Sequence, residues 1–287
     1  MSEPRLLLCT DMDRTIIPNG AQPEHPRARK TFSEFCEKPQ VVLVYVTGRH
    51  QVLVQKAIKH YSLPVPDFMI TDVGTKIYHR DKQQWNDLRA WEEEIDKDWN
   101  GKNSQELKAL FHDVSDIHLQ ELSKQNTHKL SYYVYLDANV ESLLSLMDKR
   151  LEEYGVHASL VWSVDEPRGI GLLDILPLNA TKLHAIDFLR NQLGYKLNEV
   201  VFAGDSGNDL PVLESSIQSV LVANAANEVK IAARSRAEQN GNLQSLYIAT
   251  GNNANKNGNY AAGVMEGVCH FVPAFRKKLE QDGFCYE

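Results

Sequence analysis

The stretch LLLCTDMDRTIIPNG, residues 6–20, passes from an unbroken apolar run into two acids one residue apart, Asp11 and Asp13, and then through Thr15 into turn residues. An apolar run without alternation predicts a strand buried on both faces, as in the parallel sheet of an α/β protein. Ligands of such sheets bind beyond the carboxyl ends of the strands. The stretch therefore predicts an α/β fold with two carboxylates at its ligand-binding edge.

Apolar strands and helical patterns alternate over most of the chain. We expect strands at 5–11, 41–48, 67–74, 171–178, 199–205, 219–224 and 246–250. We expect helices at 28–37, 51–61, about 180–193, near 208–214 and near 226–236. This order indicates a doubly wound, mostly parallel, Rossmann-like α/β core.

The pattern changes between residues 80 and 168. Apolar residues fall at helical spacing from Leu107 to Ile117, segments 129–137 and 157–166 are typical of strands, and 140–151 predicts a second amphipathic helix. Residues 81–124 also hold eleven Asp or Glu against six Lys or Arg, together with Trp85, Trp91 and Trp99, which we expect in the core of this insertion. We therefore predict a discontinuous catalytic core at 1–79 and 169–287 and an inserted α+β cap at 80–168.

Composition excludes some classes of partner. The net charge of −7 without a basic run argues against a nucleic-acid partner, and the longest aliphatic run, VVLVYV at 41–46, is too short to span a membrane. Four cysteines without a C-x-x-C pair do not predict a disulfide framework, so we expect a cytoplasmic protein.

Mostly polar residues, with two glycines, follow the predicted strands at their carboxyl ends. They are Asp11, Asp13, Thr15, Thr47, Gly48, Arg49, Asp72, Gly74, Asp205, Asn208 and Asp209. Converging carboxylates repel one another unless a cation lies among them, and oxygen ligands without His or Cys favour Mg²⁺. The sequence therefore predicts a magnesium site formed with Asp11, Asp13, Asp205 and Asp209.

Magnesium in such a setting is commonly shared with a substrate phosphate, which predicts phosphoryl transfer. Thr47, Gly48 and Lys182, which opens the helix after LLDILPLNAT, could bind the phosphate. Asp11 is then the predicted nucleophile, forming an aspartyl phosphate. Asp13 is the predicted general acid and base for the leaving alkoxide and the hydrolytic water.

Four segments together resemble a known superfamily. DMDRT, YVTGR, a lysine after LDILP, and GDSGND occur in the order typical of the haloacid dehalogenase superfamily of phosphohydrolases, and the insertion resembles its sugar-phosphatase branch. With TDVGTKIYH and AAGVMEGVCHF added, the chain is similar to the sucrose-phosphatase family. The resemblance implies Asp11 as nucleophile and Asp13 as acid and base. It also implies Thr47 and Lys182 as phosphate ligands and Mg²⁺ on Asp11, the Asp13 carbonyl and Asp205, with Asn208 and Asp209 in support. We expect Thr15 to support the same site.

Two positions depart from that family pattern. Arg14 stands where Gly or Asn is usual, and Lys76 stands where an acid is expected. These two departures leave the identity of the substrate undecided. Our candidates for contacts with the substrate are His50, Asp72, Gly74, Thr75 and Lys76, together with the Asn-rich segment 251–260.

Three functions remain open at this point. The first is hydrolysis of a sugar phosphate monoester, with sucrose 6-phosphate as the expected substrate. The second keeps the chemistry but changes the sugar, to mannosyl- or glucosyl-3-phosphoglycerate or a hexose phosphate. The third is a weakly catalytic phosphosugar-binding partner of a sugar-phosphate synthase. We expect a monomer, which could associate with such a synthase.

Overall fold

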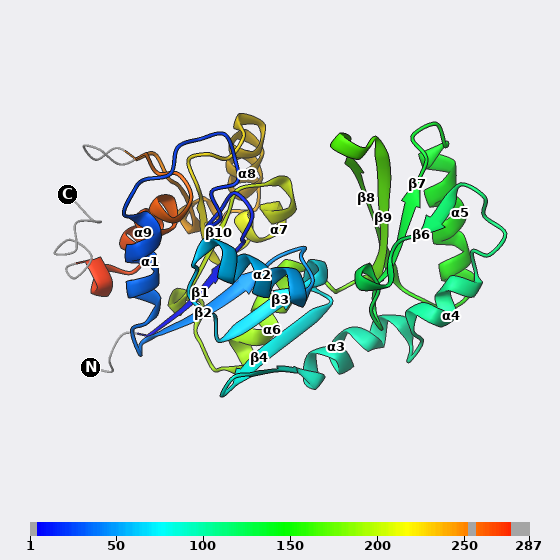
Figure 1. The fold of residues 1–287 in the computed structure, drawn as a ribbon, viewed down its shortest axis with the longest axis horizontal. Helices are drawn as coiled ribbons and strands as arrows, with labels where there is room; N and C mark the ends of the chain where they lie inside the picture. The colour runs from blue at the N-terminus through cyan, green and yellow to red at the C-terminus, as the bar shows by residue number, and fades with distance from the viewer. Residues whose placement is uncertain (1–4, 252–256, 277–287) are drawn as a thin grey trace.

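Two β-sheets organise the chain, as Figure 1 shows for the computed structural model, which describes residues 5–251 and 257–276. The larger sheet has the order β12-β11-β10-β1-β2-β3-β4-β5 and the smaller one the order β6-β7-β9-β8. The parallel strands of the larger sheet are β1 (Leu6–Thr10), β2 (Val41–Val46), β3 (Phe68–Thr71), β10 (Val200–Gly204), β11 (Gln218–Leu221) and β12 (Leu246–Ile248). The predicted mostly parallel α/β core is confirmed.

Helices cover both faces of this core sheet. On one face lie α1 (Ala28–Cys36), α2 (Gln51–Tyr61) and α9 (Ala261–Phe271). On the other lie α6 (Lys182–Gln192), α7 (Leu210–Leu213) and α8 (Asn227–Gln239). Within β1, Leu6 and Leu8 belong to the first cluster whereas Leu7 and Cys9 belong to the second. The run is uniformly apolar because successive side chains enter two different cores.

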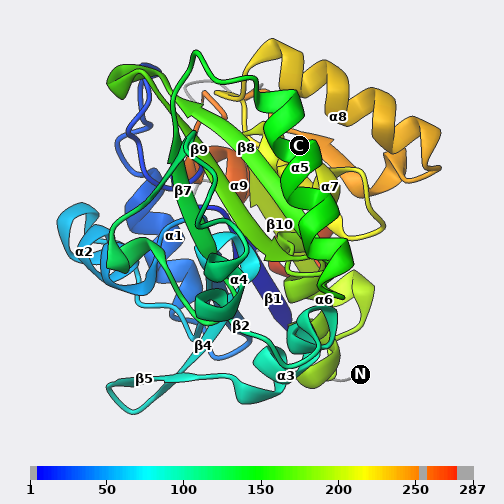
Figure 2. The same cartoon turned by 90° about the vertical axis from the view of Figure 1, so that its right-hand side faces the viewer.

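The smaller sheet forms the cap. Its strands are β6 (Ile117–Leu119), β7 (Leu130–Val134), β8 (Ala158–Asp165) and β9 (Ile170–Pro177), all antiparallel to their neighbours. The helices α4 (Ser104–Ala109) and α5 (Val140–Glu153) lie on the side of this sheet away from the core (Figure 1). Figure 2, seen from the cap side, shows β7, β9 and β8 in front of the core strands. The predicted α+β cap is therefore present.

Both predicted boundaries of the cap are displaced. The antiparallel strands β4 (Lys76–Asp81) and β5 (Gln84–Asp87) extend the core sheet, so the cap begins after residue 87 rather than at 80. We expected residues 171–178 to re-enter the core, but β9 pairs with β7 and β8 in the cap sheet. The apolar run was misleading because Leu173 and Ile175 enter the cap cluster while Leu176 lines a cavity on the opposite face.

The tryptophans and one helix also differ from expectation. Trp85 packs against the first core cluster and Trp91 lies in the second, so only Trp99 of the three belongs to the cap cluster. Trp91 and Trp99 sit at opposite ends of α3 (Arg89–Trp99), which connects core to cap. We expected a helix from Leu107 to Ile117, but α4 ends at Ala109 and Ile117 is the first residue of β6.

No helix among the described residues is long and apolar enough to cross a membrane. Cys9 and Cys36 carry free thiols, whereas Cys269 is disulfide-bonded. The cytoplasmic location stays a prediction.

Candidate active site

A cavity of about 640 Å³ lies between the carboxyl ends of the core strands and the cap sheet. The predicted site residues that line it are Asp11, Asp13, Thr47, Gly48, Lys182, Asp205 and Asn208. The cap contributes Lys124, Ser159, Val161 and Leu176, none of which the sequence singled out. Side chains from distant parts of the chain meet here because parallel strands end at the same edge of their sheet.

Lys182 lies at the centre of the polar groups on the core side. It is the first residue of α6, whose preceding residue Thr181 caps the helix by accepting from the backbone of His184. The buried Lys182 Nζ donates to Asp11 Oδ1 and to Asp209 Oδ1, at 2.8 Å each. Burial would lower the pKa of Lys182, but the two carboxylates outweigh it and raise that pKa. The lysine therefore stays charged.

Asp209 organises the segment that follows β10. Its Oδ2 accepts from the backbone N–H groups of Asp205 and Ser206, at 3.1 Å each, and from the Ser206 hydroxyl at 3.2 Å. Gly204 permits this turn, since a Cβ there would lie 2.5 Å from the Asp209 carboxyl carbon. Asp209 is fully buried, with both oxygens engaged, so it holds Lys182 and the turn in place.

Asp11, Asp205 and Asp209 each present an oxygen within 4.8 Å of the others. Burial is the main cause that raises the pKa of Asp11 to about 7 and that of Asp205 to about 6, and the neighbouring carboxylates add to it. Three acids facing one buried lysine leave excess negative charge, which a divalent cation would neutralise. Their all-oxygen character fits Mg²⁺. Since Asp209 is fully hydrogen-bonded, Asp11 and Asp205 are the residues best placed to hold the ion.

Asp13 lies outside that carboxylate group. Its carboxylate accepts from Arg49 Nε at 2.6 Å and Nη2 at 2.5 Å, and from Asn19 Nδ2 at 2.7 Å. Partial burial would raise the pKa of Asp13, but the hydrogen bonds from Arg49 and Asn19 prevail and lower it. Asp13 is therefore ionised in this arrangement, and its predicted role as a metal ligand through the main-chain carbonyl stays a prediction.

Arg49 is the functional residue whose role the sequence reasoning missed. It follows Thr47 and Gly48 directly, and its backbone N–H donates to Thr47 Oγ1 at 3.2 Å. A basic residue two positions after a predicted phosphate-binding threonine was the available signal. Thr15 has the expected supporting position, because its hydroxyl lies 3.4 Å from Asp205 Oδ1.

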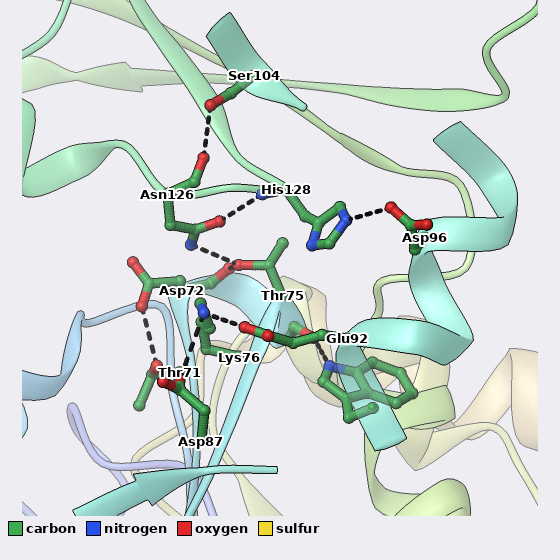
Figure 3. A network of polar contacts seen from close by, with 12 residues as sticks. Thr71, Asp72, Thr75, Lys76, Asp87, Glu92, Asp96, Ser104, Asn126 and His128 are labelled. Atoms are coloured by element: carbon green, nitrogen blue, oxygen red, sulfur yellow. Dashed lines mark hydrogen bonds and ion pairs between the residues drawn. The ribbon is translucent and has the colours of Figure 1, made fainter. Parts of the chain in front are cut away.

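Three of the predicted substrate residues, Asp72, Thr75 and Lys76, lie instead near the junction of core and cap (Figure 3). Thr75 Oγ1 accepts from Asn126 Nδ2 of the cap at 2.9 Å, and the Gly74 carbonyl accepts from Trp91 Nε1 at 3.0 Å. Lys76 pairs with Asp87 at 3.3 Å and with Glu92. The contact of Thr75 with Asn126 joins core and cap, Gly74 and Lys76 contact the connecting helix α3, and the Lys76–Asp87 pair lies within the core sheet.

Asp72 is buried at the same junction and accepts from the Thr71 hydroxyl at 2.9 Å. Burial lowers the pKa of His50, and the cap lysines Lys124 and Lys129 reinforce that direction. None of His50, Asp72, Gly74, Thr75 and Lys76 lines the cavity described above.

Part of the Asn-rich segment, residues 252–256, lies outside the described residues. Of the remainder, Asn257 and Asn259 donate to the Pro23 carbonyl, at 2.7 and 3.0 Å. These two side chains therefore hold the segment against the loop that follows β1.

The chain is similar to several known proteins. A relative from Nitrosococcus oceani named "Putative HAD-like hydrolase" is 48% identical, over 96% of this chain and 74% of that protein. Sucrose-phosphatase 1 of Nicotiana tabacum is 31% identical, over 79% of this chain and 52% of that protein. The chain thus spans about half the length of the sucrose-phosphatases it matches. The solved Synechocystis sucrose-phosphatase, in complex with sucrose and phosphate, has the same fold, with a TM-score of 0.69 at 24% identity over 93% of this chain and 98% of that one.

A family model agrees with these likenesses. The model described as sucrose-6F-phosphate phosphohydrolase matches residues 4–272, nearly the whole chain. The predicted enzyme class, a phosphoric monoester hydrolase acting on sugar phosphates, is that of this family. The resemblance inferred from the motifs is confirmed. The chain belongs to the sucrose-6F-phosphate phosphohydrolase family, within the haloacid dehalogenase superfamily.

Proposed function

We propose that this chain hydrolyses the phosphate monoester of sucrose 6-phosphate through an aspartyl phosphate on Asp11. One observation carries the proposal: Asp11 and Asp13 line the same cavity, and Asp11 Oδ1 lies 2.8 Å from the charged Lys182. A carboxylate can attack an anionic phosphate only where positive charge compensates the repulsion. Lys182 supplies part of that charge.

Asp11 must be ionised when it attacks. Burial raises the pKa of the Asp11 carboxyl to about 7, and Asp209 and Asp205 act in the same direction, whereas Lys182 favours the charged form. A Mg²⁺ ion held by Asp11 and Asp205 would add positive charge at the phosphate. The carboxylate oxygen of Asp11 then displaces the sugar alkoxide, and water later hydrolyses the acyl phosphate.

Asp13 moves the protons in both steps. It protonates the leaving sugar oxygen and then accepts a proton from the attacking water. In the structure its carboxylate is bound by Arg49 in two hydrogen bonds, which favour the ionised form. Arg49 must therefore move away, and Asp13 must take up a proton from solvent, before Asp13 can act as an acid; the incoming phosphate is the anion that draws the guanidinium away.

The choice of sucrose 6-phosphate rests on the family and on the size of the cavity. About 640 Å³ falls within the usual range for small-molecule sites and leaves room for a disaccharide beyond the phosphate. Apolar Val73, Val161 and Leu176 can face the carbon-bound hydrogens of a sugar ring, while Lys124 and Ser159 can hydrogen-bond hydroxyls.

The test is release of inorganic phosphate from a panel of sugar phosphates, with Mg²⁺ and with a chelator. We expect kcat/KM for sucrose 6-phosphate to exceed that for glucose 6-phosphate and fructose 6-phosphate by about 10²-fold or more, because unmatched polar groups in the site penalise smaller analogues. A chelator should stop turnover. A monosaccharide phosphate that equals sucrose 6-phosphate would overturn the substrate, and full activity in the chelator would overturn the mechanism.

A further inference from the structure

Arg14, between the acid pair and Thr15, is held in an unusual backbone conformation. Its φ of 59° lies in the left-handed region, where residues other than glycine are uncommon. Its backbone N–H donates to Asn19 Oδ1 at 2.8 Å, and its carbonyl accepts from Asn224 Nδ2 at 2.6 Å. Contacts on both sides of the residue thus fix where its side chain begins.

The side chain of Arg14 leads from this anchor toward Asp205. Its Nε lies 3.4 Å from Asp205 Oδ2, and its Nη2 donates to the Asn224 carbonyl at 3.4 Å. The Arg14 side chain is 46% exposed whereas that of Asp205 is 6% exposed. A half-exposed guanidinium therefore covers one oxygen of a buried carboxylate at the cavity wall.

That oxygen belongs to one of the two acids best placed to hold a divalent ion. Asp209 has both oxygens in hydrogen bonds, and Asp11 Oδ1 is taken by Lys182. On Asp205, Oδ1 faces the Thr15 hydroxyl and Oδ2 faces Arg14 Nε, at 3.4 Å each, so a cation that binds this carboxylate through Oδ2 would share that oxygen with Arg14. Two positive groups cannot both lie against one carboxylate oxygen without strong repulsion.

We infer that the Arg14 guanidinium competes with the divalent cation for Asp205 and so weakens cation binding by the free protein. A cation that binds must displace the guanidinium from Asp205, while the backbone contacts keep Arg14 at the cavity wall. In the absence of the cation, Arg14 supplies the charge that limits repulsion among Asp11, Asp205 and Asp209. The inference concerns the binding of the ion, so it stands or fails separately from the choice of sugar.

The test is calorimetric titration of chelator-treated protein with MgCl₂, comparing the unaltered chain with Arg14→Asn. Asparagine tolerates a left-handed φ and removes the charge. A partly exposed ion pair contributes modestly, so we expect the Kd for Mg²⁺ to fall by about threefold to fivefold in the variant. The rise in Tm on adding Mg²⁺ should also be larger for Arg14→Asn, because tighter binding to the native state stabilises it more.

The matched control is Arg236→Asn. Arg236 also pairs with a carboxylate, Glu214, at 3.7 Å, with a similar side-chain exposure of 53%, but neither residue lines the cavity. Arg236→Asn makes the net charge more negative by the same amount as Arg14→Asn, and it should leave the Kd for Mg²⁺ unchanged. A Kd for Mg²⁺ that is unchanged or higher in Arg14→Asn would overturn the inference. Equal tightening in both variants would also overturn it, since the effect would then come from net charge alone.

Discussion

The core and the cap contribute to the cavity in different ways. On the core side, charged groups are paired: Lys182 lies in buried contacts with Asp11 and Asp209, and Arg49 pairs with the partly exposed Asp13. On the cap side, the lining residues are Lys124, Ser159, Val161 and Leu176. The core thus contributes the paired charges, whereas the cap contributes two polar and two apolar side chains. This difference predicts that core variants change turnover and cap variants change selectivity.

The junction between the two regions is polar and specific. Asn126 of the cap donates to Thr75, and on the α3 side His128 Nε2 lies 2.9 Å from Asp96 Oδ1 (Figure 3). Trp91 of α3 is buried in a core cluster while Trp99, at the other end of the helix, is buried in the cap. Thr75, which we expected to touch the substrate, therefore contacts the cap, and its contact with the substrate stays a prediction.

The largest effect should come from Asp11→Asn in the core. Removing the nucleophile should lower kcat for any phosphate monoester by about 10³-fold or more, because no other carboxylate can form the acyl phosphate. The measurement is phosphate release, with circular dichroism to verify the fold. Asp187→Asn, on the same helix as Lys182 but outside the cavity, should keep full activity. Substantial turnover by Asp11→Asn would contradict the covalent mechanism.

Asp13→Asn should separate proton transfer from the rest of the core chemistry. We expect kcat for a sugar phosphate to fall by about 10²-fold to 10⁴-fold, because an alkoxide leaving group needs protonation. An aryl phosphate should lose much less in its first step, since its leaving group is already a stable anion. Burst kinetics on both substrates measure this step. Equal losses of burst rate would rule out Asp13 as the acid.

Lys124→Ala tests the cap side of the comparison. Loss of a charged donor to a sugar hydroxyl should raise KM for sucrose 6-phosphate by roughly tenfold while leaving kcat/KM for a small aryl phosphate unchanged. Lys149→Ala is the control, because this cap lysine pairs with Glu153 on an exposed helix face. If both substrates lose equally, Lys124 contributes to phosphate binding and the division between core and cap does not hold at this residue.

The smallest effect should come from Asp113→Asn, which alters the cap away from the cavity. Arg150 donates to both Asp113 oxygens, at 2.6 and 2.8 Å, and these hydrogen bonds lower the pKa of Asp113 to about 2. Because that pKa is about 3.9 in an unfolded chain, the stabilisation is present above about pH 4 and is lost as the pH falls toward 2.

For this exposed pair we expect the variant to lose about one degree in Tm at pH 7, with unchanged activity. Calorimetry at pH 7 and pH 3 gives the comparison. A difference in Tm that persists undiminished at the lower pH would show that the carboxylate charge is not its source.

The core and most of its site could be predicted from the sequence for one physical reason. In a parallel sheet every strand delivers its last residues to the same edge, so Asp11, Thr47 and Asp205 were predictable as neighbours once three strands were recognised. Lys182 was predicted at the same edge from a segment, 171–178, that we placed in the wrong sheet, and it lies there because α6 begins where the chain returns from the cap. Local sequence patterns are enough to predict neighbouring site residues when the sheet topology fixes where each strand ends.

Only the tertiary structure decided what depends on packing between distant segments. The apolar run of β9 is compatible with either sheet, and pairing with β7 and β8 placed it in the cap. The contacts of Arg49 with Asp13 and of Arg14 with Asp205 depend on side-chain reach across loops, as does the position of Thr75 opposite Asn126. Such contacts leave no repeating pattern in the sequence. Each joins two individual side chains whose distance depends on the whole fold.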